Sequence, residues 1–469
     1  MQVSVETLDG LERKLTVAFP AVIVEEKINT RLKELTRNIK LAGFRPGKVP
    51  LNIIKKRFFG NGYGEVANQL VRETLAEAFK QSMLHPVNYP KISMDLMEPN
   101  KDFHYTAIFE VLPEISITEL TKIPIEIIHS EVTEQDIANM LDKMRNQQKD
   151  WEEVTRTTLN GDKVIIDFEG FINDGEISVH KGRDFDIIIG SGNLIGDFEQ
   201  GLVEKEKDQE FEIDVAFPKD YHHKEIAGKD VNFKVKIKKI LEGRLPKLDD
   251  DFAKRFAVNE GGMASLNKDV EKNMMLELDK CVKILNKQHV FTKLVEANAF
   301  EVPQTFVENE IGHLRHNMHH RIFGTKHSKN ERIYNFPNSM FEEKAKYNVR
   351  LRLLLDKYKE KHAITIDPIR VEQLIKEHAS AYDNQEEYYA KCKNEWAKEI
   401  YHLVMEDMLV EKIIEPAQII DKKMDYEAIV DSPEIKQAQQ GVSAKELEEI
   451  NKIFSKHDKR VEKPDSGSE

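Results

Sequence analysis

Cysteine is scarce in this sequence, which has only Cys281 and Cys392 among its 469 residues. Each lies in a helix-like pattern without a CxxC partner, so the sequence indicates no disulfide framework, and a reducing compartment fits this usage. No segment reaches the roughly 18 uncharged apolar residues that a transmembrane helix needs. The N-terminus, MQVSVETLDGLERKL, also lacks a basic start followed by an apolar run. We therefore expect a cytoplasmic protein that makes no use of a membrane.

Nucleotide-binding motifs are absent as well. The chain contains neither GxxxxGK followed by Ser or Thr nor GxGxxG, the patterns that bring backbone amides against phosphate groups. We expect no cofactor. Any binding of other proteins would then be governed by affinity and exchange rather than by ATP.

The charge is distributed unevenly along the chain. Apolar residues make up 40% of the sequence and charged residues 33%, with a net charge of -13, which is typical of a globular protein of about two to four domains. The first 60 residues nevertheless hold twelve Lys and Arg against six Asp and Glu. A basic head on an acidic body indicates an anionic partner such as nucleic acid or a nucleoprotein, although a basic face can also be merely solvated.

The segment GFRPGKVP, residues 43 to 50, lies between two helix-like stretches. Alternating residues predict a β-hairpin over residues 2–19, apolar spacings of three and four predict a helix over 24–39, and a second helical pattern begins near Pro50. Glycine and proline would shape an exposed turn there. The residues that it would present together are Phe44, Arg45 and Lys48, with Gly43 and Gly47 shaping the loop. The alternative is a tight turn whose aromatic side chain folds back onto the helices.

GFRPGKVP in this position resembles the ribosome-docking signature of trigger factor, the family of bacterial ribosome-associated chaperones. The resemblance continues through MQVSVET at the start, LPKLDDDFAKRF at 245–256 and ASAYDN at 379–384, and covers about residues 1–430. It implies that nascent and unfolded polypeptides are clients and that molecules off the ribosome can form homodimers. The implied ribosome-binding residues are Phe44, Arg45 and Lys48, which contact the large-subunit protein beside the exit tunnel, with Gly43 and Gly47 shaping the loop. We further expect Lys55, Lys56 and Arg57 to extend the contact to nearby rRNA.

A β-rich domain is predicted in the middle of the chain, where apolar residues alternate at 164–168, 211–217 and 231–237. The stretches DFEG, FDIIIGSGNLIGDFEQG and AFPKDYHHKEIAGK resemble the FK506-binding-protein (FKBP) type of peptidyl-prolyl isomerase. The resemblance implies a catalytic pocket formed by Phe168, Phe185, Leu194, Ile195, Phe198, Tyr221 and Phe233. The alternative is that these aromatic residues are only the core of a small β-domain.

The implied isomerase chemistry needs no acid, base or metal. An X-Pro bond turns over a torsional barrier of roughly 20 kcal/mol, which an apolar pocket lowers by favouring the twisted imide. The chain departs from the family at Ser178 and Val179, where an aromatic and an acidic residue are usual, and at Gly196-Asp197, which replaces Pro-Gly. These departures predict an altered pocket and weakened turnover.

The remainder of the chain reads as helical, with apolar stripes at 304–323, 341–361, 368–381 and 386–413 and a long helix capped by Ser265. The resemblance implies a helical body with two arms, joined by the helix after Thr133. We thus predict a multidomain α+β fold. Its parts are a ribosome-binding α+β domain (1–113), a linker strand and helix (114–150), an inserted FKBP-like domain (151–244), an all-α chaperone body (245–431) and a charged extension (432–469).

Three smaller patterns in the sequence each allow a structural interpretation as well as a functional one. The histidines His313, His316, His319 and His320 would share a broad helix face, but no Cys or placed carboxylate completes a ligand set, so we predict no metal site. The methionines Met274, Met275, Met318, Met405 and Met408 are expected mostly as core filling rather than as an adaptable client surface. Ser443 with Glu446 predicts a capping box ahead of a short amphipathic helix in the extension.

Taken together, the sequence predicts a ribosome-associated, ATP-independent chaperone with peptidyl-prolyl cis-trans isomerase activity. One alternative is mainly a free FKBP-type prolyl isomerase, which would fail to protect clients that lack proline. A second alternative is a scaffold for folded assembly intermediates, which would prefer native partners over unfolded ones.

Overall fold

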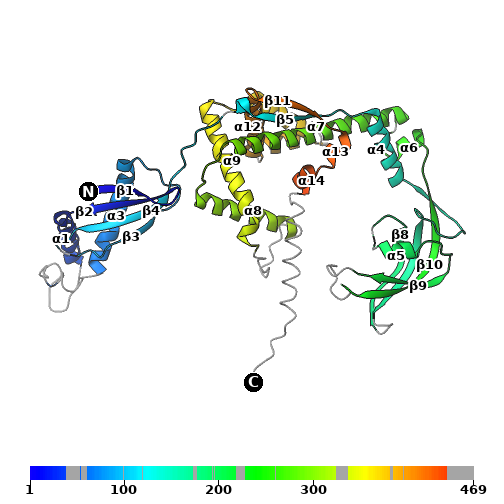
Figure 1. Ribbon diagram of the computed structural model, residues 1–469, viewed down its shortest axis with the longest axis horizontal. Helices are drawn as coiled ribbons and strands as arrows, with labels where there is room; N and C mark the ends of the chain where they lie inside the picture. Colours follow the sequence, from blue (N-terminus) through cyan, green and yellow to red (C-terminus); the bar gives the residue numbers. More distant parts are fainter. Residues whose placement is uncertain are drawn as a thin grey trace, which may run out of the picture. The chain divides into compact units, whose positions relative to one another are not determined.

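The computed structural model describes residues 1–38, 53, 61–98, 100–118, 120–172, 177–192, 194, 196–217, 228–258, 260–323, 336–380, 384–394 and 396–440. The chain forms two compact units (Figure 1). Unit 1 comprises residues 1–129, 281–424 and 431–469, and unit 2 comprises residues 130–280 and 425–430. The predicted multidomain α+β fold is confirmed. None of the described helices has the length and apolar character needed to cross a membrane.

Unit 1 begins with a four-stranded antiparallel sheet in the order β1-β2-β4-β3, and the described part of this region also contains α1 and α3. The elements are β1 (Gln2–Thr7), β2 (Glu12–Phe19), α1 (Ala21–Asn38), α3 (Asn61–Ser82), β3 (Lys91–Met94) and β4 (Phe103–Glu110). The predicted hairpin turn is present, with Gly10 at a φ of 56° that favours glycine. Inward-facing residues of β2 and β4, including Phe19 and Tyr105, form a core with α1 and α3. The Tyr105 hydroxyl lies 3.1 Å from Thr74 Oγ1 on α3, joining helix to sheet.

The helical part of unit 1 contains six helices besides the C-terminal half of α7 (Gly262–Ala297) and the 3-10 turns η1 (Leu120–Lys122) and η2 (Asn338–Met340). The helices are α8 (Gln304–Phe323), α9 (Glu342–Lys361), α10 (Pro368–Ser380), α11 (Gln385–Asn394), α12 (Ala397–Ile414) and α14 (Pro433–Gln440). The helix predicted over 386–413 is wrong in one respect, because it is two helices. At the break Trp396 has a φ of -107°, and its N–H bonds back to the Lys391 carbonyl at 3.4 Å.

A two-stranded parallel sheet adds β structure to the helical body. β5 (Pro124–His129) pairs along its whole length with β11 (Gln418–Lys423), nearly three hundred residues later in the chain. The stretch predicted as a linker strand is therefore β5, whereas β11 was not predicted. Lys422 of β11 pairs with Glu126 of β5 at 2.8 Å. The chain passes from unit 1 into unit 2 shortly after each of these strands, at residues 130 and 425.

Two asparagines, Asn286 in α7 and Asn298 directly after its end, bond to the backbone that leads into and through β5. Asn286 accepts from the Ile128 N–H at 2.7 Å and donates to its carbonyl at 3.0 Å. Asn298 does the same for Thr118, at 2.7 Å and 3.3 Å. Each side-chain amide thus presents the donor and acceptor that a neighbouring strand would supply.

The N-terminal sheet is joined to the helical body in a similar way, by a side chain that bonds to backbone groups. Glu110, at the end of β4, is only 8% exposed. Its two carboxylate oxygens accept from the backbone N–H groups of Gln304 and Thr305, at 2.8 Å and 2.9 Å, in the first turn of α8. These amides have no partner within the helix, so the carboxylate satisfies them and opposes the helix dipole.

Unit 2 contains a five-stranded antiparallel sheet in the order β6-β10-β7-β8, with β9 also paired to β10. Its elements are α4 (Glu134–Gln147), β6 (Asp150–Glu153), β7 (Lys163–Ile172), β8 (Ile177–Ile188), α5 (Gly196–Gly201), β9 (Glu210–Ala216), β10 (Asp230–Arg244), α6 (Asp250–Lys254) and α13 (Tyr426–Val430), with the first part of α7. The predicted cap at Thr133 is confirmed as a capping box with Asp136. The predicted cap at Ser265 is wrong: α7 begins at Gly262, and Asp250 accepts from the Met263 N–H at 3.0 Å.

Both cysteines and most of the singled-out methionines are structural. Cys281 and Cys392 are buried in different helices, and no disulfide joins them. Met274 and Met318 are buried, Met405 and Met408 pack against core clusters, and Met275 is 48% exposed. The expectation that most of these methionines fill core is therefore confirmed. The capping box predicted at Ser443 lies outside the described residues.

The asparagine contacts predict a stability effect in unit 1. Asn298→Leu keeps the volume of the side chain but leaves the Thr118 N–H and carbonyl unpaired. We expect a loss of about 1–3 kcal/mol in the free energy of unfolding, measured by urea denaturation followed by far-ultraviolet circular dichroism. Asn68→Leu is the control, because the exposed Asn68 amide bonds only to the Gly64 carbonyl of its own helix. Equal urea midpoints for the two variants would contradict the assignment.

Candidate functional site

Four phenylalanines from four elements meet in unit 2. Phe168 of β7 lies edge-on to Phe185 of β8, Phe198 of α5 and Phe233 of β10, with ring centroids 5.6, 6.1 and 6.0 Å apart. Phe198 and Phe233 contact each other at 5.2 Å, with ring planes 85° apart. Phe198 and Phe233 are each 6% exposed, whereas Phe185 is 42% exposed. The cluster therefore has two buried rings and a half-buried one, and Phe185 is its most exposed ring.

Two glycines allow the rings to lie close to the neighbouring strands. A Cβ at Gly182 of β8 would come within 2.4 Å of the Phe168 ring, and one at Gly170 of β7 within 2.8 Å of the Phe233 ring. Any side chain at these positions would push the rings out of place. The backbone of the sheet thus forms part of the surface on which the aromatic cluster rests.

A bulge in β8 sets the position of Phe185. β8 carries one more residue than β7 between the pairs that flank it, and Asp184 in the bulge has a φ of 51°. Its N–H donates to Asp167 Oδ1 at 2.8 Å, and Lys238 approaches Asp167 at 3.4 Å. The backbone hydrogen bond from Asp184, followed by the Lys238 charge, holds the pKa of Asp167 below its usual range. Asp167 therefore stays ionised and fixes the bulge.

Glu199, in the first turn of α5, organises the loop beside the cluster. It is 4% exposed, and its carboxylate accepts from the N–H groups of Gly192 at 3.1 Å and Leu194 at 2.9 Å. Burial alone would raise the pKa of Glu199, but these bonds, with further ones from Gly190 and Ser191, outweigh burial and lower it. The ionised carboxylate therefore holds Leu194 against the core of the sheet.

The predicted pocket residues are placed to different extents. Phe168, Phe185, Phe198 and Phe233 meet directly, and Leu194 is half-buried beside them. Ile195 and Tyr221 lie outside the described residues. Ser178 and Val179 belong to β8, although their side chains lie outside the described part, and Gly196-Asp197 begins α5. Sequence reasoning missed Glu199 and Asp184, and the only signal for Glu199 is an acidic residue just inside a helix after a glycine-rich loop.

The part of the cluster that the structure describes presents apolar rings. Its edge-on rings suit an apolar proline ring. An X-Pro bond held there would lose contact with water, which favours the less polar twisted imide over the planar ground state. The arrangement therefore fits rotation about a bond rather than bond cleavage.

The predicted ribosome-binding loop, Gly43 to Lys48, lies outside the described residues, as do Lys55, Lys56 and Arg57. The helices on either side are described. Lys27 and Arg31 of α1 pair with Glu73 and Glu65 of α3, at 2.9 Å and 3.1 Å. As the residue number rises on α1 it falls on α3, so the helices are antiparallel.

The histidines of α8 include one close pair. The rings of His316 and His320 lie 4.3 Å apart at 77°. Within the described residues, no three His, Cys, Asp or Glu side chains come together in a way that could hold a metal ion.

Glu199 predicts a pH effect with a definite sign. Its folded-state pKa is lowered from an ordinary value of 4.5, so its contribution to stability is present above that value and is lost as the pH falls through the folded-state pKa. We expect Glu199→Gln to unfold at a lower temperature than wild type at pH 7, with the difference shrinking below about pH 4. Thermal unfolding across this range measures it. A difference independent of pH would contradict the role, and the exposed Glu206→Gln serves as the control at pH 7.

Comparison with known proteins places all three parts of the chain. The model of the bacterial trigger factor protein matches residues 1–144, and the model of its C-terminus matches residues 262–415. Between them, the model of FKBP-type peptidyl-prolyl cis-trans isomerase matches residues 154–238, which include the aromatic cluster.

Curated relatives match nearly the whole chain. Trigger factor of Marinobacter nauticus is 37% identical over 432 residues, covering 92% of this chain and 98% of the relative. Trigger factor of Psychromonas ingrahamii is 37% identical over 433 residues, covering 92% and 99%. A chain solved for "Promiscuous Substrate Recognition in Folding and Assembly Activities of the Trigger Factor Chaperone" is 16% identical, with a TM-score of 0.49 over 89% of this chain and 100% of that one. On the family models and the curated relatives, the chain belongs to the trigger factor family.

Proposed function

We propose that the protein is an ATP-independent chaperone that docks on the ribosome, binds nascent polypeptides at the exit tunnel and isomerises their X-Pro bonds. The single observation that carries the proposal is the family match, at 37% identity over 92% of the chain, which includes an FKBP-type isomerase domain. Membership of the trigger factor family supports a chaperone that contains a peptidyl-prolyl cis-trans isomerase domain. The ribosomal contact, the clients and the domain limits predicted from the sequence are parts of the proposal.

Docking is assigned to the loop at 43–48. Phe44 would enter a small apolar groove, while Arg45 and Lys48 pair with anionic groups around it, since an aromatic anchor with flanking cations suits such a surface. Gly43 and Gly47 would shape the turn. Support for the assignment comes from the excess of Lys and Arg in the first 60 residues.

Isomerase catalysis is assigned to the aromatic cluster. The predicted catalytic residues are Phe168, Phe185, Leu194, Ile195, Phe198, Tyr221 and Phe233. Phe185 would close the open side of the site over a bound proline, because it is the most exposed ring of the cluster. A hydroxyl from Tyr221 would donate to a substrate carbonyl.

Ribosome docking is tested by co-sedimentation with 70S ribosomes at two salt concentrations. We expect the wild type to pellet and a triple variant, Phe44→Ala with Arg45→Ala and Lys48→Ala, to remain in the supernatant, with the larger difference at low salt. The control removes two cations elsewhere in the same domain, Lys91→Ala with Lys101→Ala, both at exposed positions. Equal sedimentation of the triple variant and this control would refute the loop assignment.

Catalysis is tested separately from protection of clients. Phe185→Ala should lower kcat/KM for a proline-containing tetrapeptide about tenfold, since truncating a pocket ring removes roughly 1–2 kcal/mol of transition-state contact. Phe171→Ala is the matched control, because its ring lies under Lys234 at 5.4 Å on the charged face of the sheet. Both variants should still prevent aggregation of a client that lacks proline. Failure of the wild type to protect that client would favour the free-isomerase alternative.

A further inference from the structure

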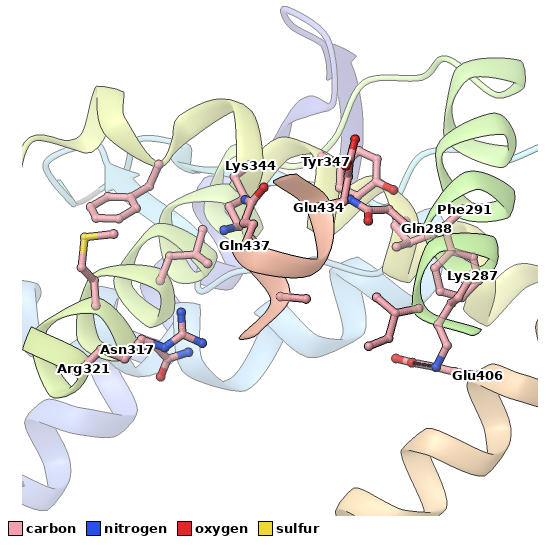
Figure 2. Close-up of a pocket in the computed structure, with 16 residues that line it drawn as sticks. Lys287, Gln288, Phe291, Asn317, Arg321, Lys344, Tyr347, Glu406, Glu434 and Gln437 are labelled. Carbon is pink, nitrogen blue, oxygen red and sulfur yellow. Dashed lines mark hydrogen bonds and ion pairs between the residues drawn. The ribbon is translucent and has the colours of Figure 1, made fainter. Parts of the chain in front are cut away.

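Two hollows of the described structure lie outside the aromatic cluster, one in each unit. The first has a volume of about 560 Å³ and lies among α7, α8 and α9 of unit 1, where Lys287 pairs with Glu406 at 3.1 Å (Figure 2). The second has a volume of about 490 Å³ and is lined mostly by charged residues of β7, β8, β9 and β10 in unit 2. Phe168 of the cluster and its neighbour Asp167 both line the second hollow, which therefore adjoins the cluster.

The side chain of Asp167 lies behind the aromatic cluster. Residues of a β-strand point alternately to the two faces of a sheet, so Asp167 and Phe168 point to opposite sides of β7. Phe168 belongs to the cluster on the inner face. The Asp167 carboxylate is on the outer face, among the charged residues that line the second hollow. An effect of Asp167 on the cluster must therefore pass through the backbone of the sheet.

Both strands beside β7 bulge next to Asp167. On one side, β8 carries one residue more than β7 between the pairs that flank Asp167. On the other side, Lys238 is an extra residue of β10, because its neighbours Ile237 and Lys239 pair with consecutive residues of β7. Bulges are over-represented next to active sites, where they redirect a side chain. Two of them on either side of one carboxylate point to such a role here.

The Asp167 carboxylate joins the two bulges. Its Oδ1 accepts from the Asp184 N–H in the β8 bulge at 2.8 Å and lies 3.4 Å from Lys238 Nζ in the β10 bulge. Lys238 also pairs with the Asp184 carboxylate. Asp184 has a φ of 51°, a left-handed conformation that costs free energy for a residue with a Cβ. The contacts to Asp167 and Lys238 therefore stabilise a backbone conformation that is unfavourable by itself.

The Phe185 ring depends on this conformation. Phe185 follows Asp184 directly, so the backbone of Asp184 sets the direction in which the ring leaves the strand. On the inner face the ring lies edge-on to Phe168, with centroids 5.6 Å apart. Phe185 is 42% exposed, so packing restrains it less than it restrains the buried rings of Phe198 and Phe233.

We propose that Asp167 is a positioning residue of the isomerase, which acts through the Asp184 backbone to hold the Phe185 ring against a bound proline. The inference rests on the proposed function, in which the aromatic cluster catalyses isomerisation. Loss of the carboxylate would let the bulge relax, and the ring would then adopt orientations that do not contact the proline. Catalysis would fall while the protein stays folded, because a small misplacement of a group at the site weakens its contact in the transition state.

A double-mutant cycle between Asp167 and Phe185 tests this path. Asp167→Ala should lower kcat/KM for a proline-containing tetrapeptide about three- to fivefold in the full chain. In a chain that already carries Phe185→Ala, the same change should lower kcat/KM less than about 1.5-fold, because the ring that Asp167 positions is gone. A residue that acts only on the stability of the sheet would give the same loss in both chains.

Glu169→Ala is the matched control. Glu169 lies on the same strand and the same face as Asp167, pairs with Lys181 at 3.1 Å and is equally exposed, at 33% against 32%. Its pair with Lys181 lies in the regular part of the ladder between β7 and β8. Glu169→Ala should therefore change kcat/KM less than about 1.5-fold, since an exposed ion pair contributes little by itself.

Glycine at position 184 tests the backbone step. Asp184→Gly removes the need for the contact to Asp167, because glycine adopts a φ of 51° without the cost that a Cβ brings. In the Asp184→Gly chain, Asp167→Ala should lower kcat/KM no more than about twofold. Asp167→Asn keeps an oxygen acceptor for the Asp184 N–H but loses the charge, and its kcat/KM should lie between those of wild type and Asp167→Ala.

The outcomes separate this inference from the proposed function. Wild-type kcat/KM in Asp167→Ala, or an equal loss in the wild-type, Phe185→Ala and Asp184→Gly chains, would overturn this inference alone. The same holds if the loss follows the unfolded fraction of each variant, measured by circular dichroism under the assay conditions. Wild-type kcat/KM in Phe185→Ala would overturn the assignment of catalysis to the aromatic cluster and this inference with it.

Discussion

The body of unit 1 depends on backbone that is paired across a long sequence separation. β5 pairs with β11. The side-chain amides of Asn286 in α7 and of Asn298 just after it pair with the backbone at Ile128 and Thr118. Without these partners, a buried connecting segment would carry unsatisfied N–H and carbonyl groups, each costing about 1–3 kcal/mol. The pairing turns a connector into part of the core, where Leu120 and Ile125 are fully buried beside Val290 and Leu294.

This pairing also allows an isomerase domain to be carried within the chain. β5 ends at His129, directly before the chain passes into unit 2, and the Asn286 amide ties β5 to the part of α7 on which the chain returns to the body. The N-terminal sheet is likewise attached through few contacts, in which the Glu110 carboxylate accepts from two backbone N–H groups at the start of α8. In both cases a few carboxylate or amide side chains pair with backbone N–H and carbonyl groups that would otherwise lack a partner. Patterns of apolar residues in a sequence do not predict such contacts.

The local periodicity of the sequence predicted most helices and strands, but it did not predict which of them pair with one another. The hairpin over 2–19 and the helix over 304–323 follow from alternation and spacing alone, because each is a short-range pattern. β11 was missed because its sequence, QIIDKK, has no alternation and its partner lies far away in the chain. At the site, the four phenylalanines were predictable from alternating strands. Glu199 and Asp184 were not, since Glu199 accepts from the backbone N–H groups of a loop and Asp184 donates its own backbone N–H to Asp167 from a bulge.

The burial of both cysteines has a consequence for the proteins that this chain would hold. An unfolded polypeptide exposes its own thiols, and a nearby accessible thiolate or disulfide would exchange with them through a mixed disulfide. Cys281 and Cys392 are 3% and 2% exposed, and the sequence has no others. Burial keeps a client's thiol or disulfide from reaching either sulfur. Contact with a client can therefore be long and close, yet it leaves no covalent link and does not alter the client's redox state.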